Sequence, residues 1–240
     1  MRKKKLLMIL GGIVLLIIYT PVLVIASITI YKNIILNPTP TPTPSISVPL
    51  DLSDVLDTFD DNKLKWLTGT DNNEFGSLTK TIAGGKYILR FISSQSMNLP
   101  ITQTFTAAPN FTTSVDTKKV VGPSTADSGL IFNRLDANNL YRFSVNDSAK
   151  QYCLYLRYQG VWTALIPWTA STTIKTNETN NLKVKDVGGQ ISLYINGNKV
   201  NQVTNAVLYL NTDMGINMIV YQADQTVEFE FDNFKYQVNN

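Results

Sequence analysis

Residues 226–236 read TVEFEFDNFKY, and this stretch decides the fold class. Two sets of side chains alternate along it, the acidic Glu228, Glu230 and Asp232 and the apolar Val227, Phe229 and Phe231. A period of two residues is that of a β-strand with one face against a core and the other toward solvent. Apolar residues then continue at Phe234 and Tyr236 on the opposite parity, so one residue must be extra if all are buried. We predict a β-bulge at Asp232 and Asn233.

Short alternating runs recur about every 8 to 12 residues from Asp51 onward, with turn residues between them, which predicts an all-β sandwich or barrel. The clearest hairpin is QISLYINGNKVNQV at 190–203, where Asn196 and Gly197 supply the positive φ angles of a tight turn. Two more strands are predicted within NLYRFSVND at 139–147 and QYCLYLRYQGVW at 151–162. Their expected core faces are Tyr141, Phe143 and Val145, and Tyr152, Leu154, Leu156 and Tyr158.

Charge is distributed unevenly along the 240 residues. Of the 21 basic residues, 5 lie near the N-terminus, at Arg2, Lys3, Lys4, Lys5 and Lys32. The remaining 16 share the part from Asp51 onward with all 18 acidic residues, which gives it a net charge of −2. The lysines of this part are scattered, so nucleic acid is excluded as a partner.

Cys153 is the only cysteine and histidine is absent. An internal disulfide is therefore excluded, and any enzyme must use carboxylates, lysines or tyrosines.

The chain divides into a cytoplasmic basic stub (1–5), a transmembrane anchor (6–31), a proline- and threonine-rich linker (32–50) and an extracellular domain (51–240). The uncharged run at 6–30 would span about 37 Å as a helix, more than the roughly 30 Å of a bilayer core. A cleaved secretory signal is the alternative, but the apolar core of a signal is usually only about 7 to 15 residues long. The cluster MRKKK places the N-terminus in the cytoplasm and the rest outside the cell. The prolines of NPTPTPTP then favour an extended spacer.

Seven motifs occur in an order that resembles a known superfamily. They are FDDNKLKW, GKYILRF, SGLIFNRLDANNLYRFSV, GVWTALIPWTAS, LYINGNKV, MGI and VEFEFDNFKY. The resemblance is to bacterial extracellular domains of the concanavalin A-like lectin/glucanase superfamily, with laminin G-like domains and the 3-keto-disaccharide hydrolase domain family most similar, and it covers nearly all of 54–238. It implies a two-sheet antiparallel jelly-roll sandwich whose concave face commonly meets sugar. Lectins, hydrolases and adhesion modules share this frame, so the resemblance does not select an activity.

Glu228 and Glu230 are the weak candidates for catalytic residues. Alternate residues of a strand have Cα atoms about 6.6 Å apart, which could bring the acid groups near the roughly 5 to 5.5 Å used by retaining glycosidases. The laminarinase-type hydrolases of the resembling superfamily carry Glu-x-Asp-x-Glu or Glu-x-Asp-x-x-Glu, and this chain departs from that order. We favour the alternative that both glutamates face water and pair across strands with lysine or arginine.

A calcium site is a further hypothesis, and calcium is the one cofactor considered. Asp60 and Asp61 would join Asp232 if the first and last strands were neighbours, as they are in the resembling superfamily, and calcium requires several oxygen ligands. Asp-Asn pairs also simply make turns.

Ligand binding is predicted at aromatic and cationic side chains, because the C–H face of a sugar packs on a ring and its hydroxyls meet polar groups. The candidates are Arg142, Tyr155, Arg157, Trp162 and Trp168. Parity places the first three opposite the core faces of their strands. The alternatives are that the two tryptophans pack in the core or clamp a loop, and that the arginines pair with Glu228 or Glu230.

These observations predict a membrane-anchored extracellular domain that binds a glycan or another cell-envelope polymer without catalysis. One alternative is a glycoside hydrolase or related carbohydrate-active enzyme that uses the paired carboxylates. The second is a structural or adhesive ectodomain that binds another protein.

Overall fold

The computed structural model describes residues 53–105, 108–204 and 213–239, which form strands and turns without an α-helix. In chain order the strands are β1 (Asp54–Asp57), β2 (Gly69–Asn73), β3 (Gly76–Ile82), β4 (Tyr87–Ser93), β5 (Met97–Thr104), β6 (Asn110–Val121), β7 (Asp127–Asp136), β8 (Asn139–Asn146), β9 (Gln151–Tyr158), β10 (Val161–Ala170), β11 (Asn180–Val187), β12 (Gln190–Ile195), β13 (Asn198–Thr204), β14 (Asp213–Val220) and β15 (Thr226–Val238).

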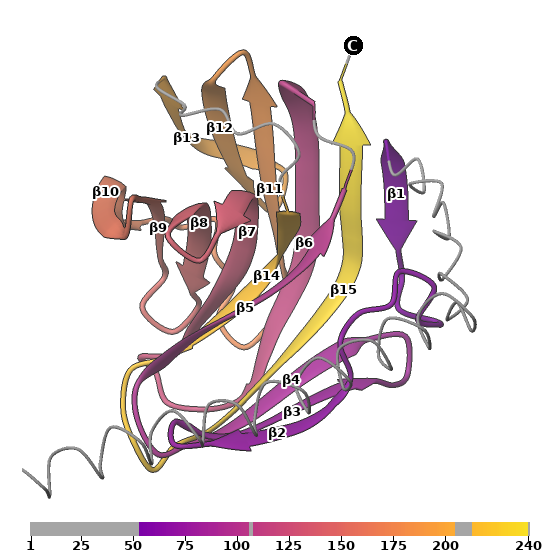
Figure 1. The fold of residues 1–240 in the computed structure, drawn as a ribbon. Helices are drawn as coiled ribbons and strands as arrows, with labels where there is room; N and C mark the ends of the chain where they lie inside the picture. The colour runs from indigo at the N-terminus through magenta and orange to yellow at the C-terminus, as the bar shows by residue number, and fades with distance from the viewer. Residues whose placement is uncertain (1–52, 106–107, 205–212, 240) are drawn as a thin grey trace, which may run out of the picture. The chain divides into compact units, whose positions relative to one another are not determined.

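The strands form two antiparallel sheets (Figure 1). Sheet A has nine strands in the order β13-β12-β11-β6-β15-β4-β3-β2, with β1 also paired to β15, and sheet B has six in the order β10-β9-β8-β7-β14-β5. The all-β prediction is confirmed, and the arrangement is consistent with a jelly-roll sandwich. No helix in the described ranges is long and apolar enough to cross a membrane. The predicted stub, anchor and linker at 1–50 lie outside those ranges.

Strand β15 contains the predicted bulge. Its pairing with β6 shifts register between Asp232 and Lys235, and Asn233 adopts a φ of 50°. The apolar residues on both sides of the shift are buried, namely Val227, Phe229, Phe231, Phe234 and Tyr236. The extra residue therefore keeps one long strand facing the core along its whole length, and the prediction is confirmed.

The hairpin predicted at 190–203 is also confirmed. It consists of β12 and β13, and Asn196 and Gly197 at its turn have φ angles of 51° and 82°. The predicted core faces of β8 and β9 are buried except at Tyr158, which is 44% exposed. Tyr158 is the last residue of β9 before the turn at Gln159 and Gly160, so its ring leaves the core.

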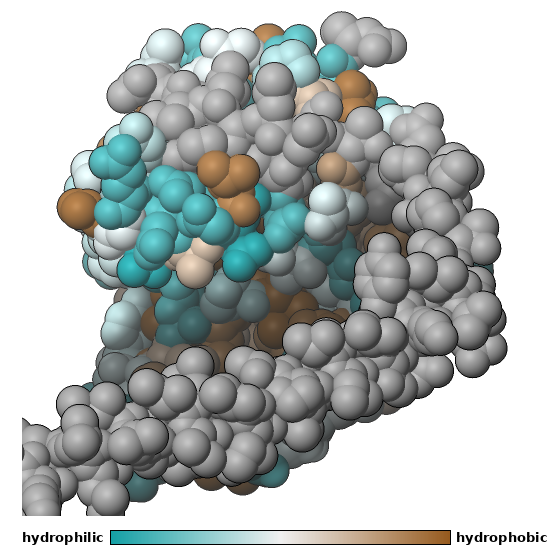
Figure 2. Space-filling view, viewed as in Figure 1, coloured by the Kyte–Doolittle hydropathy of each residue, from teal (hydrophilic) through white to brown (hydrophobic). Residues whose placement is uncertain are grey.

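Apolar side chains from both sheets fill the space between them. A connected series of aromatic rings, with centroids 5.1 to 6.3 Å apart, crosses this core and consists of Phe59, Trp66, Tyr87, Phe234, Phe105, Tyr236, Phe111, Phe132 and Tyr141. Figure 2 shows apolar side chains gathered in the shaded hollow, whereas hydrophilic side chains dominate the visible surface around β8–β10. Because the core buries the inner faces of the two sheets, only their outer faces remain for binding or catalysis.

The bulge provides a test of the fold. We expect Asn233→Val to lower the free energy of unfolding by about 1–3 kcal/mol, because a β-branched residue is strained at positive φ. Asn233→Gly accepts this φ freely and should cost only about 1 kcal/mol, from loss of the hydrogen bond that Asn233 Nδ2 donates to Asp116 Oδ2 at 2.9 Å. Urea unfolding of both variants measures the difference, and equal losses would contradict the assigned role of the bulge.

Candidate functional site

The outer face of sheet B, which points away from the core, brings most of the predicted ligand-binding residues together. Strand alternation places on it Asp127, Gly129 and Ile131 of β7, Arg142 and Ser144 of β8, Cys153, Tyr155 and Arg157 of β9, Trp162 of β10, and Gly215, Asn217 and Ile219 of β14. Most of the intervening residues of β7, β8, β9 and β14 contribute to the core. We use "the outer face of sheet B" for this set of residues.

Arg142, Tyr155 and Trp162 form a compact stack on this face. Arg142 lies opposite Tyr155 on the neighbouring strand, and its Cζ is 5.0 Å from the Tyr155 ring centroid and 4.9 Å from that of Trp162. The two rings meet edge to face, 6.3 Å apart at 81°. Cation–π contact and the two rings hold the guanidinium in place. The three residues that parity placed opposite the core, Arg142, Tyr155 and Arg157, thus share this face, and the structure adds Trp162 to Arg142 and Tyr155.

Arg157 has a different role from Arg142. Its Nε donates to the Gly160 carbonyl at 3.2 Å and its Nη1 to the Ala137 carbonyl at 2.9 Å, so it ties two loops together. Its Cζ also lies 5.5 Å from the Trp162 ring centroid. Trp162 is 36% exposed, which places it at the surface and not in the core. Arg157 thus positions the indole that Arg142 contacts.

The suggested pairing of Arg142 and Arg157 with Glu228 or Glu230 is wrong. The arginines belong to sheet B, whereas both glutamates lie on β15 in sheet A. No ion pair in the part of the chain that the structure describes involves either arginine. Arg142 Nε is buried and has no hydrogen-bond partner among the described residues.

Asn217 is a residue that the sequence analysis missed. It is 0% exposed, and neither its amide oxygen nor its amide nitrogen has a hydrogen-bond partner. A buried polar group without a partner costs about 1–3 kcal/mol, so such groups are uncommon outside functional sites. An asparagine within the otherwise apolar run MGINMIV was the available signal.

Glycine neighbours give Asn217 room on this face. Gly129 lies directly opposite Asn217 on β7, and a Cβ there would be 1.9 Å from the Phe143 carbonyl oxygen. A Cβ on Gly215 would be 2.1 Å from the Ile101 carbonyl oxygen. Backbone approaches this close exclude any side chain at both positions. The backbone beside Asn217 therefore carries no side chain at these two positions.

Asp127 is the second residue that sequence reasoning missed. It is 0% exposed, and its Oδ2 accepts a hydrogen bond from the Tyr221 hydroxyl at 2.6 Å. Burial raises the pKa of Asp127 to about 6, although Tyr221, Arg142 and Ser144 each act to lower it. A carboxyl with such a pKa changes charge close to physiological pH.

Cys153 lies among these groups and is fully buried. Burial raises the pKa of its thiol to about 12, with a further contribution from Asp127, so the thiol stays protonated near neutral pH. It acts as a small packing residue.

Trp168 is separated from the Arg142 stack. It lies on β10, beside an irregularity in the pairing of β10 with β9. It lines a pocket of 240 Å³ together with Thr125, Asn146, Gln151 and Tyr221. It therefore contributes to a surface pocket and is not a core tryptophan.

Glu228 and Glu230 occupy the outer face of sheet A. Glu228 forms an ion pair with Arg90 of the neighbouring strand at 2.9 Å, which is the cross-strand arrangement favoured from the sequence. Glu230 makes no ion pair within the described ranges and lines a pocket of 140 Å³. The two glutamates therefore differ in their surroundings.

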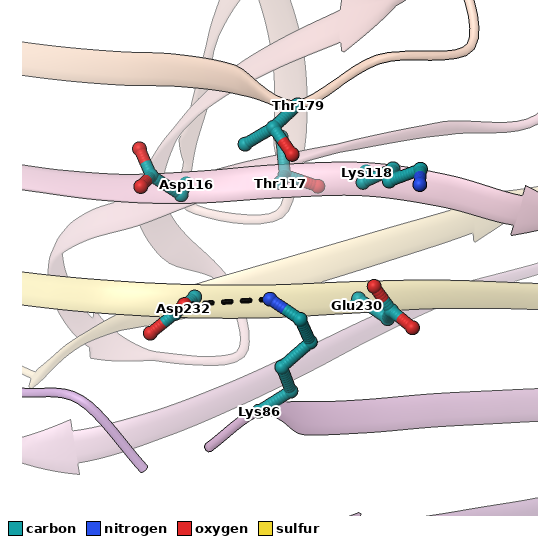
Figure 3. Close-up of a pocket in the computed structure, with 7 residues that line it drawn as sticks. All are labelled: Lys86, Asp116, Thr117, Lys118, Thr179, Glu230 and Asp232. Carbon is teal, nitrogen blue, oxygen red and sulfur yellow. Dashed lines mark hydrogen bonds and ion pairs between the residues drawn. The ribbon is translucent and has the colours of Figure 1, made fainter. Parts of the chain in front are cut away.

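Figure 3 shows this pocket on sheet A, where Lys86 extends between Asp232 and Glu230. Asp116 and Asp232 lie directly opposite each other on β6 and β15, an arrangement that like charges disfavour. The strain is relieved locally, because Asp232 pairs with Lys86 at 3.4 Å and Asp116 accepts from the Asn181 and Asn233 amides at 2.8 and 2.9 Å. These charges are satisfied within the sheet.

The residues considered for calcium lie in separate places. Strands β1 and β15 are neighbours as expected. Asp60 and Asp61 nevertheless line a different pocket from Asp232, and Asp61 pairs with Lys63 at 2.8 Å. Within 53–105, 108–204 and 213–239, no group of three or more His, Cys, Asp or Glu is placed to hold a metal ion. Calcium binding stays a prediction.

Comparisons with known proteins identify the fold. Neither a protein-family model nor a curated protein matches the sequence. Among solved structures, a Bacillus licheniformis β-glucanase is similar with a TM-score of 0.57 and 10% identity, over 78% of this chain and 99% of that chain. The GH43 BlXynB protein of Bacillus licheniformis gives a TM-score of 0.56 and 10% identity, over 77% of this chain and 39% of that chain. At these identities the likeness concerns the fold alone, which is consistent with a jelly-roll sandwich.

The raised pKa of Asp127 predicts a pH-dependent stability. Between the ordinary pKa of 3.8 and about 6, the folded protein holds a proton that the unfolded chain has released. The free energy of unfolding should therefore fall as pH rises through this window, by about 3 kcal/mol in total. Asp127→Asn should reduce this slope and leave the contribution of Asp186, whose pKa burial also raises. Urea unfolding from pH 4 to 7 tests this, and identical slopes in both proteins would contradict it.

Proposed function

We propose that this chain is a membrane-anchored protein that presents a non-catalytic glycan-binding sandwich outside the cell, with the outer face of sheet B as its binding surface. The observation that carries the proposal is the stack of Arg142, Tyr155 and Trp162, whose rings and unpaired guanidinium share one surface. Sugar binding requires such a surface, because apolar C–H faces pack on rings while hydroxyls need fixed donors and acceptors.

The electrostatic contrast between the two outer faces supports this choice of surface. On sheet A the charges next to the glutamates have local partners, as in the Glu228–Arg90 pair. On sheet B, Arg142 has no ion pair within the described ranges, and the amide of Asn217 has no hydrogen-bond partner. The guanidinium of Arg142, which is partly exposed, is the donor that this face offers to a ligand hydroxyl.

The location of the protein is proposed from the sequence. The uncharged segment at 6–31 after MRKKK supports a single membrane span with a cytoplasmic N-terminus. The proline-rich linker at 32–50 supports display of the sandwich away from the membrane. A cell-envelope polymer outside the membrane is the class of ligand that such a protein would meet.

A glycan array tests the proposed binding, using the full-length chain in a detergent without a sugar headgroup, with and without calcium. We expect selective binding that Trp162→Ala or Arg142→Ala weakens by at least about tenfold, as expected for central aromatic and arginine contacts. Arg142→Lys keeps the charge but loses the planar stacking group, so its binding should be intermediate.

Tyr194→Ala is the matched control, because Tyr194 is a partly exposed ring on sheet A, where it contacts Lys183. Its binding should equal that of the unmodified chain. A blank array in both conditions would reject glycan binding in favour of a structural or protein-binding ectodomain. Binding that depends on calcium would support a metal site.

A carbohydrate-active enzyme is the second candidate, favoured by the pocket on sheet A in which Glu230 has no ion pair. We expect no release of reducing ends from the glycans that the array identifies, and unchanged binding in Glu228→Gln and Glu230→Gln. Turnover by the unmodified chain that either substitution abolishes would instead establish a glycoside hydrolase.

A further inference from the structure

We propose that the outer face of sheet B has a second sugar-binding position at Trp168, so that it binds the interior of an extended polymer and not a single terminal sugar. This inference rests on the proposed glycan binding and specifies the class of ligand. The evidence is a second aromatic pocket on the same face, its spacing from the Arg142 stack and the small side chains of Ser144 and Cys153 between them.

The pocket at Trp168 has the composition of a sugar site. Its 240 Å³ are lined by Trp168 and Tyr221, with Asn146, Gln151 and Thr125 as the polar members. Tyr221 is 45% exposed, so its ring is accessible, while its hydroxyl is fixed by the bond to Asp127. Rings with nearby amides provide the mixed apolar and hydrogen-bonding surface that sugars require.

This pocket opens on the same face as the Arg142 stack. Asn146 and Gln151 are cross-strand partners on β8 and β9, and each lies two residues from Ser144 or Cys153 of the outer face. Side chains two apart on a strand share a face. Trp168 and Trp162 are thus two aromatic positions at opposite ends of one surface.

The two positions are separated by the length of a strand. Gln151 lines the Trp168 pocket, and Arg157, six residues further along β9, lies opposite Trp162. At about 3.3 Å per residue, the separation is about 20 Å. A single sugar cannot contact both positions at this distance, whereas a polymer of several sugars can.

The β8 and β9 residues between the two ends include two with small side chains. Ser144 and Cys153 are 0% exposed, so neighbouring groups cover them. Neither side chain projects from the sheet as a barrier. A polymer that runs parallel to β8 and β9 would contact the Trp162 end and the Trp168 end together.

The test is an array of graded-length oligosaccharides of β-1,3-glucan, β-1,4-glucan, α-1,4-glucan, mannan and β-1,4-N-acetylglucosamine, probed with the full-length chain in a sugar-free detergent. We expect affinity for the recognised series to rise with length until both positions are filled. Trp168→Ala should lower affinity for the longest members by about tenfold and leave the shortest unchanged. Gln151→Ala should give a smaller loss on the same long members and serves if the tryptophan variant does not fold.

Trp162→Ala should weaken binding at every length, and Tyr194→Ala at none. Affinity that does not depend on length, with Trp168→Ala and Gln151→Ala both unchanged, would overturn the second position while leaving glycan binding intact. No binding at any length in any series would overturn both.

Discussion

The burial of apolar side chains between two sheets is the constraint on which the rest of the structure depends. Strand β15 shows this most directly, because Phe231 and Phe234 are three residues apart and both are fully buried. A regular strand would place them on opposite faces. The bulge keeps both in the core, and it requires Asn233 to adopt a left-handed backbone. The burial of the second aromatic group offsets this local strain.

The same constraint makes the outer faces available for other roles, and the two faces differ. The outer face of sheet A holds charges that neighbours neutralise, including the opposed Asp116 and Asp232. The outer face of sheet B holds the Arg142 stack and polar groups that folding leaves without partners. Glu230 on sheet A makes no ion pair within the described ranges, but several buried polar groups without partners gather on sheet B, and such breaks in local consistency are typical of functional surfaces.

The most conspicuous motif of the chain is therefore not where the proposed function is located. The alternating acids that attract attention in TVEFEFDNFKY serve mainly sheet A, through the pair of Glu228 with Arg90 and the bulge at Asp232. The less conspicuous Asn217, in an apolar strand, has two unpartnered amide atoms. The conspicuous motif reflects the alternation of residues along one strand. Whether a polar side chain lacks a hydrogen-bond partner depends instead on the residues that surround it in the folded protein.

The sequence by itself determined the all-β class, the hairpin at Asn196 and Gly197, the bulge at Asp232 and the shared face of Arg142 and Tyr155. These features depend on periodicity and turn chemistry within a few residues, which a single chain displays directly. Only the tertiary structure placed the glutamates and arginines on different sheets, separated Trp168 from the Arg142 stack and buried Asp127 and Asn217. Periodicity says which face of a strand a residue occupies, but pairing between distant strands decides which residues are its neighbours.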